Sequence, residues 1–289
     1  MHKRLWNLLK LEFELQPKAP LLIKSGMLSP NPSLPDMQFV RTRTANGESV
    51  FIPGSSLKGV FRGFTEKVLR TANDNWACDP FGDGSCGRMM IDVDDTARVY
   101  RQSCRACKIY GNTRLRGRLS FTDALPNGGV VTETRYGVAI SRLTNAVAAG
   151  PFDIETLVQG TFKGSVVLEN FEVWQLGLLA LTLQALNDGL VKIGFGKNRG
   201  FGEVEIRPSR IVVDMAKHSH IPAQEIWGVG MFVNDAERTS YGLSAGDKLD
   251  NLPEGTSSDL GVYIRREYKA EEWQTIAERA VQSLSTMGA

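Results

Sequence analysis

The residues of this sequence whose type and spacing most clearly suggest chemistry are its four cysteines. They all lie within a thirty-residue stretch, and the last two form a C-x-x-C pair: Cys78, Cys86, Cys104 and Cys107. Four thiolates suit a tetrahedral zinc ion with no open ligand position, and a C-x-x-C turn can bring two of them to one ion. The alternative is four unrelated buried thiols, but their clustering favours a structural Zn²⁺ site.

Two glycine-rich, basic stretches form a second chemical feature. "FIPGSSLKGVFRGFTEKVLR" (51–70) has the pattern of an amphipathic helix, for which we expect Ser55 or Ser56 to be the N-cap. Free N–H groups at such a helix start favour an anion, and Lys58 and Arg62 add charge. The second stretch, "GFGKNRGFG" (194–202), follows the last helix of this region instead of opening one. Neither has the G-x-x-x-x-G-K-[ST] spacing of a nucleoside triphosphate loop. Exposed helix charges and a plain glycine-rich hairpin are the alternatives.

The surrounding patterns predict an α+β fold. Residues 6–24 alternate like one strand or a hairpin, residues 25–50 read as a long exposed loop, and 130–144, 156–170 and two short segments within 191–213 read as strands. "VWQLGLLALTLQALNDG" predicts a helix buried nearly all round, with Gly189 at its C′ position. The order strand, helix, strand, strand, helix, strand is that of a ferredoxin-like (RRM-like) βαββαβ core.

The chain divides by composition into a core and an extension. We expect a core over 1–210 with a zinc-binding insertion at about 76–118, and an extension over 211–289 that ends in an amphipathic helix. Residues 1–210 carry 27 Lys and Arg against 20 Asp and Glu, whereas residues 211–289 carry 7 against 12. Seven of the cations fall between Arg98 and Arg118, a segment without any acid. A basic body of this kind indicates a polyanionic partner, and a random scatter of surface charge is the alternative.

Composition and hydropathy place the protein in the soluble globular class. No apolar run approaches the roughly 20 residues needed to cross a bilayer, and the first residues run into strand-like alternation without a cleavage site. We therefore expect a cytoplasmic protein without a membrane partner. Disulfides are disfavoured in the cytoplasm, which strengthens the metal interpretation of the cysteines.

Three stretches, in order along about residues 8–210, together resemble the RAMP superfamily, the repeat-associated proteins of CRISPR effector complexes. "FIPGSSLKGVFRGFTE" is similar to the first-helix motif and "KIGFGKNRGFGEVEI" to the glycine-rich loop of that superfamily. "ETRYGVAISRLTNAVAAGPFDIETLVQGTFKGSVVLEN" resembles the thumb region of the type III backbone subunit. A cysteine-rich insertion after the first helix is also similar to what some of those subunits carry.

The resemblance implies a subunit that polymerises along a CRISPR RNA and uses a thumb hairpin, here about 135–158, to displace one base at regular intervals. The implied partners are the CRISPR RNA, complementary target RNA, other effector subunits and further copies or paralogues of this chain. The implied grip on the guide backbone falls on Ser55, Ser56, Lys58, Arg62, Gly196, Lys197, Arg199 and Gly200. Arg135 and Arg142 in the thumb are either RNA contacts or strand-surface residues.

The resemblance also implies a cleavage residue. In the family a loop aspartate after the first strand cuts target RNA with a divalent metal ion, and Asp36, five residues before Arg41, resembles that arrangement. A carboxylate is a poor general base at neutral pH, so positioning a hydrated Mg²⁺ or Mn²⁺ near the 2′-hydroxyl is the role we expect. A solvated loop acid in a scaffold that only binds guide RNA is the alternative.

Two further alternatives are a free-standing ribonuclease and a zinc-ribbon protein without an RNA role. The first needs a histidine-containing site, and the three histidines, His2, His218 and His220, lie outside the three motifs. The resemblance says nothing about residues 211–289, which we expect to contact a neighbouring subunit or to modify the family role.

Overall fold

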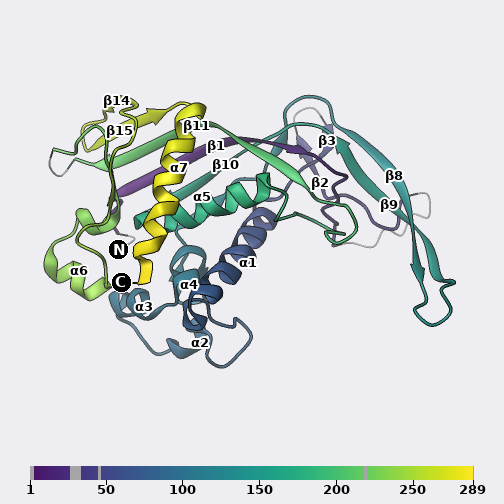
Figure 1. The fold of residues 1–289 in the computed structure, drawn as a ribbon, viewed down its shortest axis with the longest axis horizontal. Coiled ribbons are helices and arrows are strands. Elements are labelled where there is room, and N and C mark those ends of the chain that lie inside the picture. Colours follow the sequence, from purple (N-terminus) through teal and green to yellow (C-terminus); the bar gives the residue numbers. More distant parts are fainter. Residues whose placement is uncertain (1–2, 27–33, 45–46, 218–219, 289) are drawn as a thin grey trace.

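The structure is a computed structural model that describes residues 3–26, 34–44, 47–217 and 220–288. Its main element is a seven-stranded sheet in which every pair is antiparallel, with the order β14-β15-β11-β1-β10-β6 and β7 paired to β10 (Figure 1). The strands of this sheet are β1 (Asn7–Pro17), β6 (Leu119–Phe121), β7 (Leu125–Pro126), β10 (Phe162–Glu169), β11 (Val204–Ala216), β14 (Thr256–Asp259) and β15 (Tyr263–Tyr268). The expected mixed α+β class is confirmed.

The remaining strands form two-stranded pairs outside the sheet. They are β2 (Arg41–Thr44) with β3 (Gly47–Val50), β4 (Gly111–Asn112) with β5 (Leu115–Arg116), β8 (Val131–Ile140) with β9 (Val147–Gln159), and β12 (Ile226–Trp227) with β13 (Lys248–Leu249). The helices are α1 (Gly54–Ala72), α2 (Cys86–Met89), α3 (Thr96–Gln102), α4 (Arg105–Tyr110), α5 (Val173–Asn187), α6 (Asp235–Tyr241) and α7 (Trp273–Gln282), with short 3-10 turns at Asp74–Trp76, Val229–Met231, Ala270–Glu272 and Ser283–Gly288.

Strand β1 lies between β10 and β11 and sets the two faces of the sheet. Its alternate residues Leu9, Leu11 and Phe13 are buried in the core. The residues between them, such as Lys10 and Glu12, therefore point to the opposite face, because successive side chains of a strand alternate. Figure 1 shows α1, α5 and α7 on one side of the sheet, so no helix of the described residues covers the other face.

Helix α5 is buried on nearly all sides because α7 covers the side that the sheet leaves open. The two helices touch closely: a Cβ on Gly177 would lie 2.3 Å from the carbonyl oxygen of Ala280. Gly189 follows the helix with a φ of +71°, the left-handed conformation expected of a C′ residue. The predicted all-round burial of this helix is thus confirmed, and the C-terminal segment supplies part of it.

Three of the predicted elements differ from the structure. Within the expected loop 25–50, residues 41–50 form the β2–β3 hairpin, while residues 27–33 and 45–46 lie outside the described residues. The single strand expected over 156–170 is divided between β9 and β10, because the chain reverses after Gly160, which has a φ of +153°. The two short strands expected over 191–213 are one long strand, β11, preceded by a loop in which the N–H of Ile193 donates to the carbonyl oxygen of Gly202 at 2.9 Å.

The C-terminal segment is continuous with the core in this structure. The expected boundary between residues 210 and 211 falls inside β11, and β15 pairs with that strand along its second half. Helix α6 packs against α3, where the rings of Tyr241 and Tyr100 have centroids 6.2 Å apart. The segment therefore extends the sheet, covers α5 and contacts the cysteine-containing insertion.

Candidate metal centre and nucleic-acid interface

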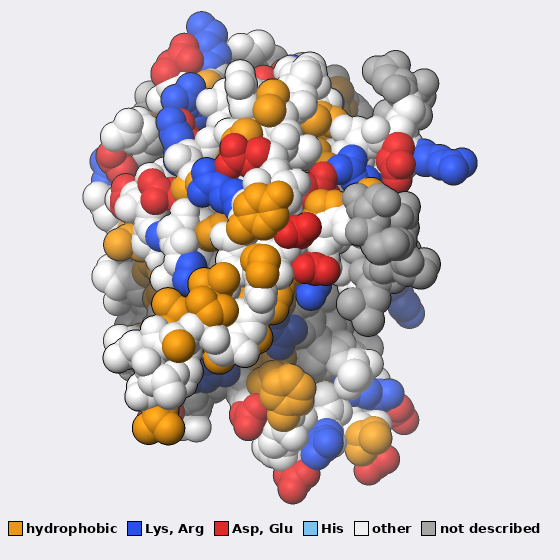
Figure 2. Space-filling model, turned by 90° about the vertical axis from the view of Figure 1, so that its right-hand side faces the viewer, with side chains coloured by type: hydrophobic (Ala, Val, Ile, Leu, Met, Phe, Trp, Pro, Cys, Tyr) orange, Lys and Arg blue, Asp and Glu red, His pale blue; other side chains and the backbone are white. Residues whose placement is uncertain are grey.

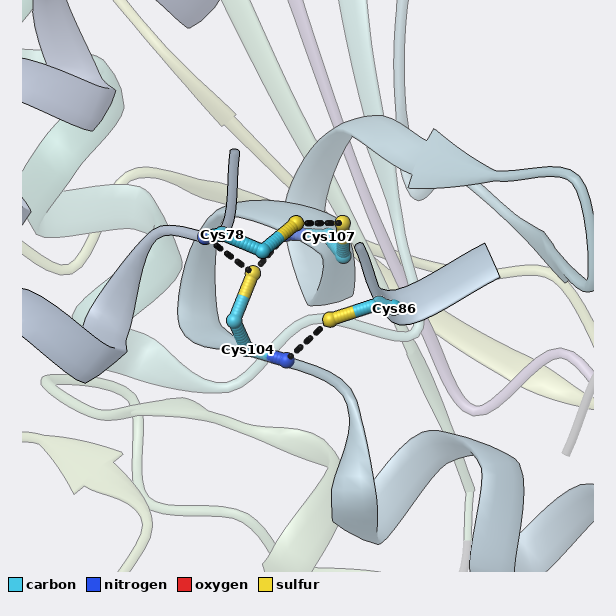
Figure 3. A group of neighbouring side chains, drawn as sticks. All are labelled: Cys78, Cys86, Cys104 and Cys107. Atoms are coloured by element: carbon cyan, nitrogen blue, oxygen red, sulfur yellow. Dashed lines mark hydrogen bonds between the residues drawn. The ribbon is translucent and has the colours of Figure 1, made fainter. Parts of the chain in front are cut away.

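The four cysteines converge on one point, as Figure 3 shows. Their sulfur atoms all lie within 4.8 Å of one another, and the sulfurs of Cys78 and Cys107 are 3.7 Å apart. A tetrahedral zinc ion with Zn–S bonds of about 2.3 Å spaces its sulfur ligands by roughly 3.8 Å. The cluster can hold a metal ion, and its dimensions are consistent with a structural zinc.

Short helices and their starts position the four thiols. Cys86 opens α2, Cys104 is the N-cap of α4, and Cys107 lies in the first turn of that helix. The sulfur of Cys104 accepts the backbone N–H groups of Cys107 and Cys78, both at 3.4 Å, and the sulfur of Cys86 accepts that of Cys104 at 3.2 Å. Backbone donors of this kind orient thiolate ligands and stabilise their charge.

Electrostatics favour a thiolate at Cys104, whereas the hydrogen bonds to Cys104, together with burial, raise the pKa values of Cys86 and Cys107. Hydrogen bonds from the thiols of Cys107 and Cys86 lower the pKa of Cys104, and two backbone N–H groups act in the same direction. Arg62 of α1 lies beside the cluster, with its Nη2 4.0 Å from the sulfur of Cys107. Its other contacts are an ion pair with Glu66 and a hydrogen bond to the carbonyl oxygen of Gly111. Arg62, which we expected to contact the guide backbone, thus lies beside the cysteines.

Helix α1 begins at Gly54, two or three residues earlier than an N-cap at Ser55 or Ser56 implies, and it is capped differently. Its N-cap is Pro53, without a side-chain cap, so the prediction of Ser55 or Ser56 as N-cap is wrong. The N–H of Gly54 donates to Oδ1 of Asp123 at 2.8 Å, and a Cβ on Gly54 would lie 2.5 Å from the carbonyl oxygen of Phe121. The helix start is thus pressed against the chain after β6, and the Asp123 carboxylate occupies the place where an anion was expected.

A basic groove lies further along α1, between that helix and the loop that precedes β11. It has a volume of about 470 Å³, and three lysines line it: Lys67, Lys192 and Lys197. None of its lining residues is acidic within the described part of the chain. We call this feature the α1 groove. It brings together the two stretches that the sequence marked as basic and glycine-rich.

The glycines of α1 open this groove. Gly59 and Gly63 line it one helical turn apart, and a Cβ at either position would meet nothing within 4 Å. Glycine inside a helix costs about 1 kcal/mol relative to alanine. Since no neighbouring atom of the described chain excludes a side chain there, the glycines leave space for something outside the protein.

Burial tunes the lysines near the groove. It lowers the pKa of Lys197, and the charge of Lys67 lowers it further. Burial, followed by the charge of Arg62, lowers the pKa of Lys58 in the same way. Neither lysine has an acidic partner within 4 Å among the described residues. A phosphate placed there would meet cations that no carboxylate neutralises.

A family model for the RAMP superfamily matches residues 14–205, well over half of the chain. The chain belongs to the RAMP superfamily. That superfamily is associated with CRISPR RNA-binding complexes, so RNA and the subunits of such a complex are the partners that membership indicates. A comparison with curated proteins found no match. No helix in the described ranges is long and apolar enough to span a bilayer.

Other expected RNA-contacting residues of this RAMP protein lie outside the groove lining, on the loop that precedes β11 and in the first turn of α1. Gly196 and Gly200 have φ angles of +70° and +80°, which lets the loop turn tightly beside α1. Arg199 is exposed, and its guanidinium lies 5.1 Å from the ring centroid of Phe195. Ser55 is exposed and Ser56 half-buried in the first turn of α1. The sequence analysis did not single out Lys67 or Lys192. Lys67 could have been found, because Gly59, Gly63 and Lys67 recur at four-residue spacing and therefore lie on one helix face.

The β8–β9 hairpin extends away from the sheet (Figure 1). Arg135 on it pairs with Glu133, and Arg142 near its tip is exposed. Figure 2 faces this end of the RAMP protein and shows hydrophobic side chains along it; Tyr136 is 74% and Leu143 is 93% exposed. The hairpin thus presents both apolar and basic side chains to solvent.

Asp36 lies beside the middle of that hairpin, where Asp153 of β9 pairs with Tyr136 of β8. It is exposed, and its Oδ2 accepts the backbone N–H of Asp153 in β9 at 3.1 Å. Arg41, which the sequence motif pairs with it, instead forms an ion pair with Glu155. A single accessible carboxylate suits Mg²⁺ or Mn²⁺, which share their ligands with water and substrate phosphates. Of the histidines, His220 is exposed, whereas His2 and His218 lie outside the described residues.

The helix-free face of the sheet differs from the groove in its charge. Its cations all have acidic partners within 4 Å: Lys10 with Glu12, Lys163 with Glu14, Lys18 and Arg207 with Glu205, Arg210 with Glu12 and Glu267, and Arg265 with Asp214. On this face the two central strands, β1 and β10, present no aromatic side chain. We call this feature the paired sheet face.

Proposed function

We propose that this protein is a guide-RNA-binding backbone subunit of a type III CRISPR interference complex. The observation that carries the proposal is the α1 groove, where Lys67, Lys192 and Lys197 line one cavity without an acidic residue. Lysines in such a groove bind phosphates as point charges and make affinity depend strongly on salt. Gly59 and Gly63 allow a nucleic-acid backbone to approach α1 closely.

The sheet order supports a ferredoxin-like core for this subunit. The four strands β11, β1, β10 and β6 are adjacent and antiparallel, α1 connects β1 to β6, and α5 connects β10 to β11. In this interpretation the β8–β9 hairpin is the thumb. Its exposed apolar residues, such as Tyr136 and Leu143, would contact bases, and Arg135 and Arg142 would contact phosphates.

We assign a structural role to the cysteine centre. Zn²⁺ held by Cys78, Cys86, Cys104 and Cys107 would fix the insertion against α1, because Arg62 joins that helix to the cluster. The four thiolates leave no position for a substrate, so the ion would take no part in a reaction.

We further propose that Asp36 supports cleavage of complementary target RNA. Its exposed carboxylate would hold a hydrated Mg²⁺ or Mn²⁺ while the backbone N–H of Asp153 fixes one of its oxygens. When bound, such an ion supplies charge stabilisation beside the attacking 2′-hydroxyl. The structural alternative is a scaffold subunit that binds guide RNA without cutting.

The test uses the complex assembled with guide RNA and its partner subunits. Asp36→Ala should lower the rate of target cleavage in Mg²⁺ by about 100-fold or more, since it removes the metal-positioning group, while guide binding stays unchanged. Asp188→Ala, an exposed acid next to the end of α5, is the matched control and should cut at the normal rate. If the Asp36→Ala variant cuts target RNA at the full rate, the proposed catalytic role of Asp36 is wrong, and the scaffold alternative stands.

A further inference from the structure

The basic run from Arg98 to Arg118 is only partly explained by the groove and the metal centre. Some of its members turn inward: Arg105 lies over the ring of Trp76 at 4.1 Å, and Lys108 over that of Tyr100 at 5.1 Å. Others line a separate cavity of about 450 Å³ between α3 and α6. We call it the α3–α6 pocket. It lies between the cysteine insertion and the C-terminal segment, and neither the groove nor the metal centre includes it.

Cations dominate this pocket. Arg114, Arg116, Arg118 and Lys3 line it, and no Asp or Glu is among the lining residues that the structure describes. Arg118 is 2% exposed; its guanidinium lies 4.0 Å from the ring centroid of Tyr100 and donates to the carbonyl oxygen of Asn170. A buried, stacked guanidinium is a fixed positive charge at the inner end of the pocket.

The outer arginines have partners that a ligand can replace. Arg114 lies 3.6 Å from Asp94 and Arg116 lies 3.3 Å from Glu169, and both arginines are exposed. Exposed ion pairs of this type contribute about 0–1 kcal/mol. The Nη2 of Arg114 also donates to the carbonyl oxygen of Val93 at 3.0 Å. A phosphate accepts bidentate hydrogen bonds from arginine and can therefore replace the two exposed ion pairs.

Two tyrosines give the pocket an aromatic wall. Tyr100 is buried and Tyr241 is half-buried at the C-terminal end of α6, with their rings tilted by 58°. Tyr100 is covered by Arg118 and Lys108, so Tyr241 is the ring that a ligand can reach, and aromatic rings stack nucleobases with little regard to sequence. The volume lies within the range of about 300–1,000 Å³ that is usual for small-ligand sites.

We propose that the α3–α6 pocket binds a nucleoside monophosphate unit, with its phosphate on Arg114 and Arg116 and its base against Tyr241. The unit comes either from a free nucleotide or from the 5′-phosphorylated end of an RNA strand. The second source rests on the proposed RNA-binding function, whereas the first does not.

The first experiment measures binding of AMP to the purified full-length protein by calorimetry. Arg114→Gln with Arg116→Gln should weaken AMP binding at least tenfold, and Tyr241→Ala at least fivefold. Arg98→Gln with Arg101→Gln, two exposed α3 positions that do not line the pocket, is the matched control and should change the affinity less than twofold. Absence of AMP binding, or inorganic phosphate binding as tightly as AMP, overturns the proposal.

The second experiment separates the two sources. Short RNAs with a 5′-phosphate and a 5′-hydroxyl are compared, with AMP as competitor, in the native protein and in Lys67→Gln with Lys197→Gln. A 5′-phosphate preference that AMP removes identifies the strand end as the source, and equal binding of both RNAs beside intact AMP binding identifies the free nucleotide. AMP binding should survive in the groove variant even where general RNA binding is lost. If the groove variant loses AMP binding while the pocket variants keep it, the proposal is wrong.

Discussion

The α1 groove and the paired sheet face both carry cations, but in very different charge environments. On the sheet face each cation lies beside a carboxylate of a neighbouring residue or strand, as Lys163 does beside Glu14. In the groove Lys67, Lys192 and Lys197 share a cavity with no acid among the described residues. The difference teaches that a basic composition indicates a polyanion partner most strongly where cations gather without their counter-charges. We therefore expect the RNA site beside α1 and not on the open sheet face, which many RRM-like folds use.

The largest effect is expected from loss of the cysteine centre, which contacts the groove helix α1 through Arg62. Cys107→Ser, or removal of metal by a strong chelator, should destabilise the protein by more than about 4 kcal/mol, because metal loss belongs to the severe class of lesions. Thermal unfolding with and without added Zn²⁺ measures it, and RNA affinity should fall in parallel because α4 and Arg62 lie against the cluster. Unchanged thermal stability after complete metal removal would contradict a structural metal.

The direct test compares matched lysine pairs. Lys67→Gln with Lys197→Gln should weaken single-stranded RNA binding by roughly 10- to 100-fold and lower the salt slope by about 1.4, since each phosphate contact contributes about 0.7. Lys10→Gln with Lys163→Gln on the paired sheet face removes the same formal charge and should change affinity less than twofold. Titrations at several salt concentrations measure both, and equal losses in the two variants would erase the distinction between the surfaces.

A third test uses the glycines of the groove. Gly59→Ala with Gly63→Ala should raise the free energy of unfolding by about 1–2 kcal/mol, because alanine is the better helix former and the new methyl groups meet nothing. The same change should weaken RNA binding by about fivefold if the RNA backbone uses that space. Denaturant unfolding and RNA titration supply the two numbers. Gln274→Ala, exposed on α7, serves as control, and a stabilised variant with full RNA affinity would refute close approach at this helix.

The smallest effect concerns pH. Burial lowers the pKa of Lys197, so between that value and the unfolded value the unfolded chain binds more protons, and stability rises with pH. RNA binding needs the charged form, so affinity should fall as pH rises through the same window. On the paired sheet face the pKa shift has the opposite direction: hydrogen bonds to Asp214 raise the pKa of Arg265. Lys197→Arg should remove about a twofold loss of affinity as the pH rises toward 10.5, the ordinary pKa of lysine, because arginine stays charged. An unchanged pH profile would speak against Lys197 as a contact.

Part of the fold and of the site followed from local patterns. The possible metal site of four cysteines, the buried helix α5 with Gly189 after it, and the amphipathic α1 were all predicted, because each depends on residues close together in the chain. Strand limits were less predictable: β9 and β10 share one continuous alternation, and only the reversal after Gly160 separates them.

The sequence by itself determined which residues can do chemistry here, since ligand type, helix periodicity and glycine position are local properties. Tertiary structure alone decided how those residues are used. It placed Asp123 at the start of α1, directed Arg62 to the cysteines, and brought Lys67 beside Lys192 and Lys197. These outcomes depend on contacts between distant segments, and the same lysine is a neutralised surface charge or a phosphate-binding group according to the carboxylates that the fold puts beside it.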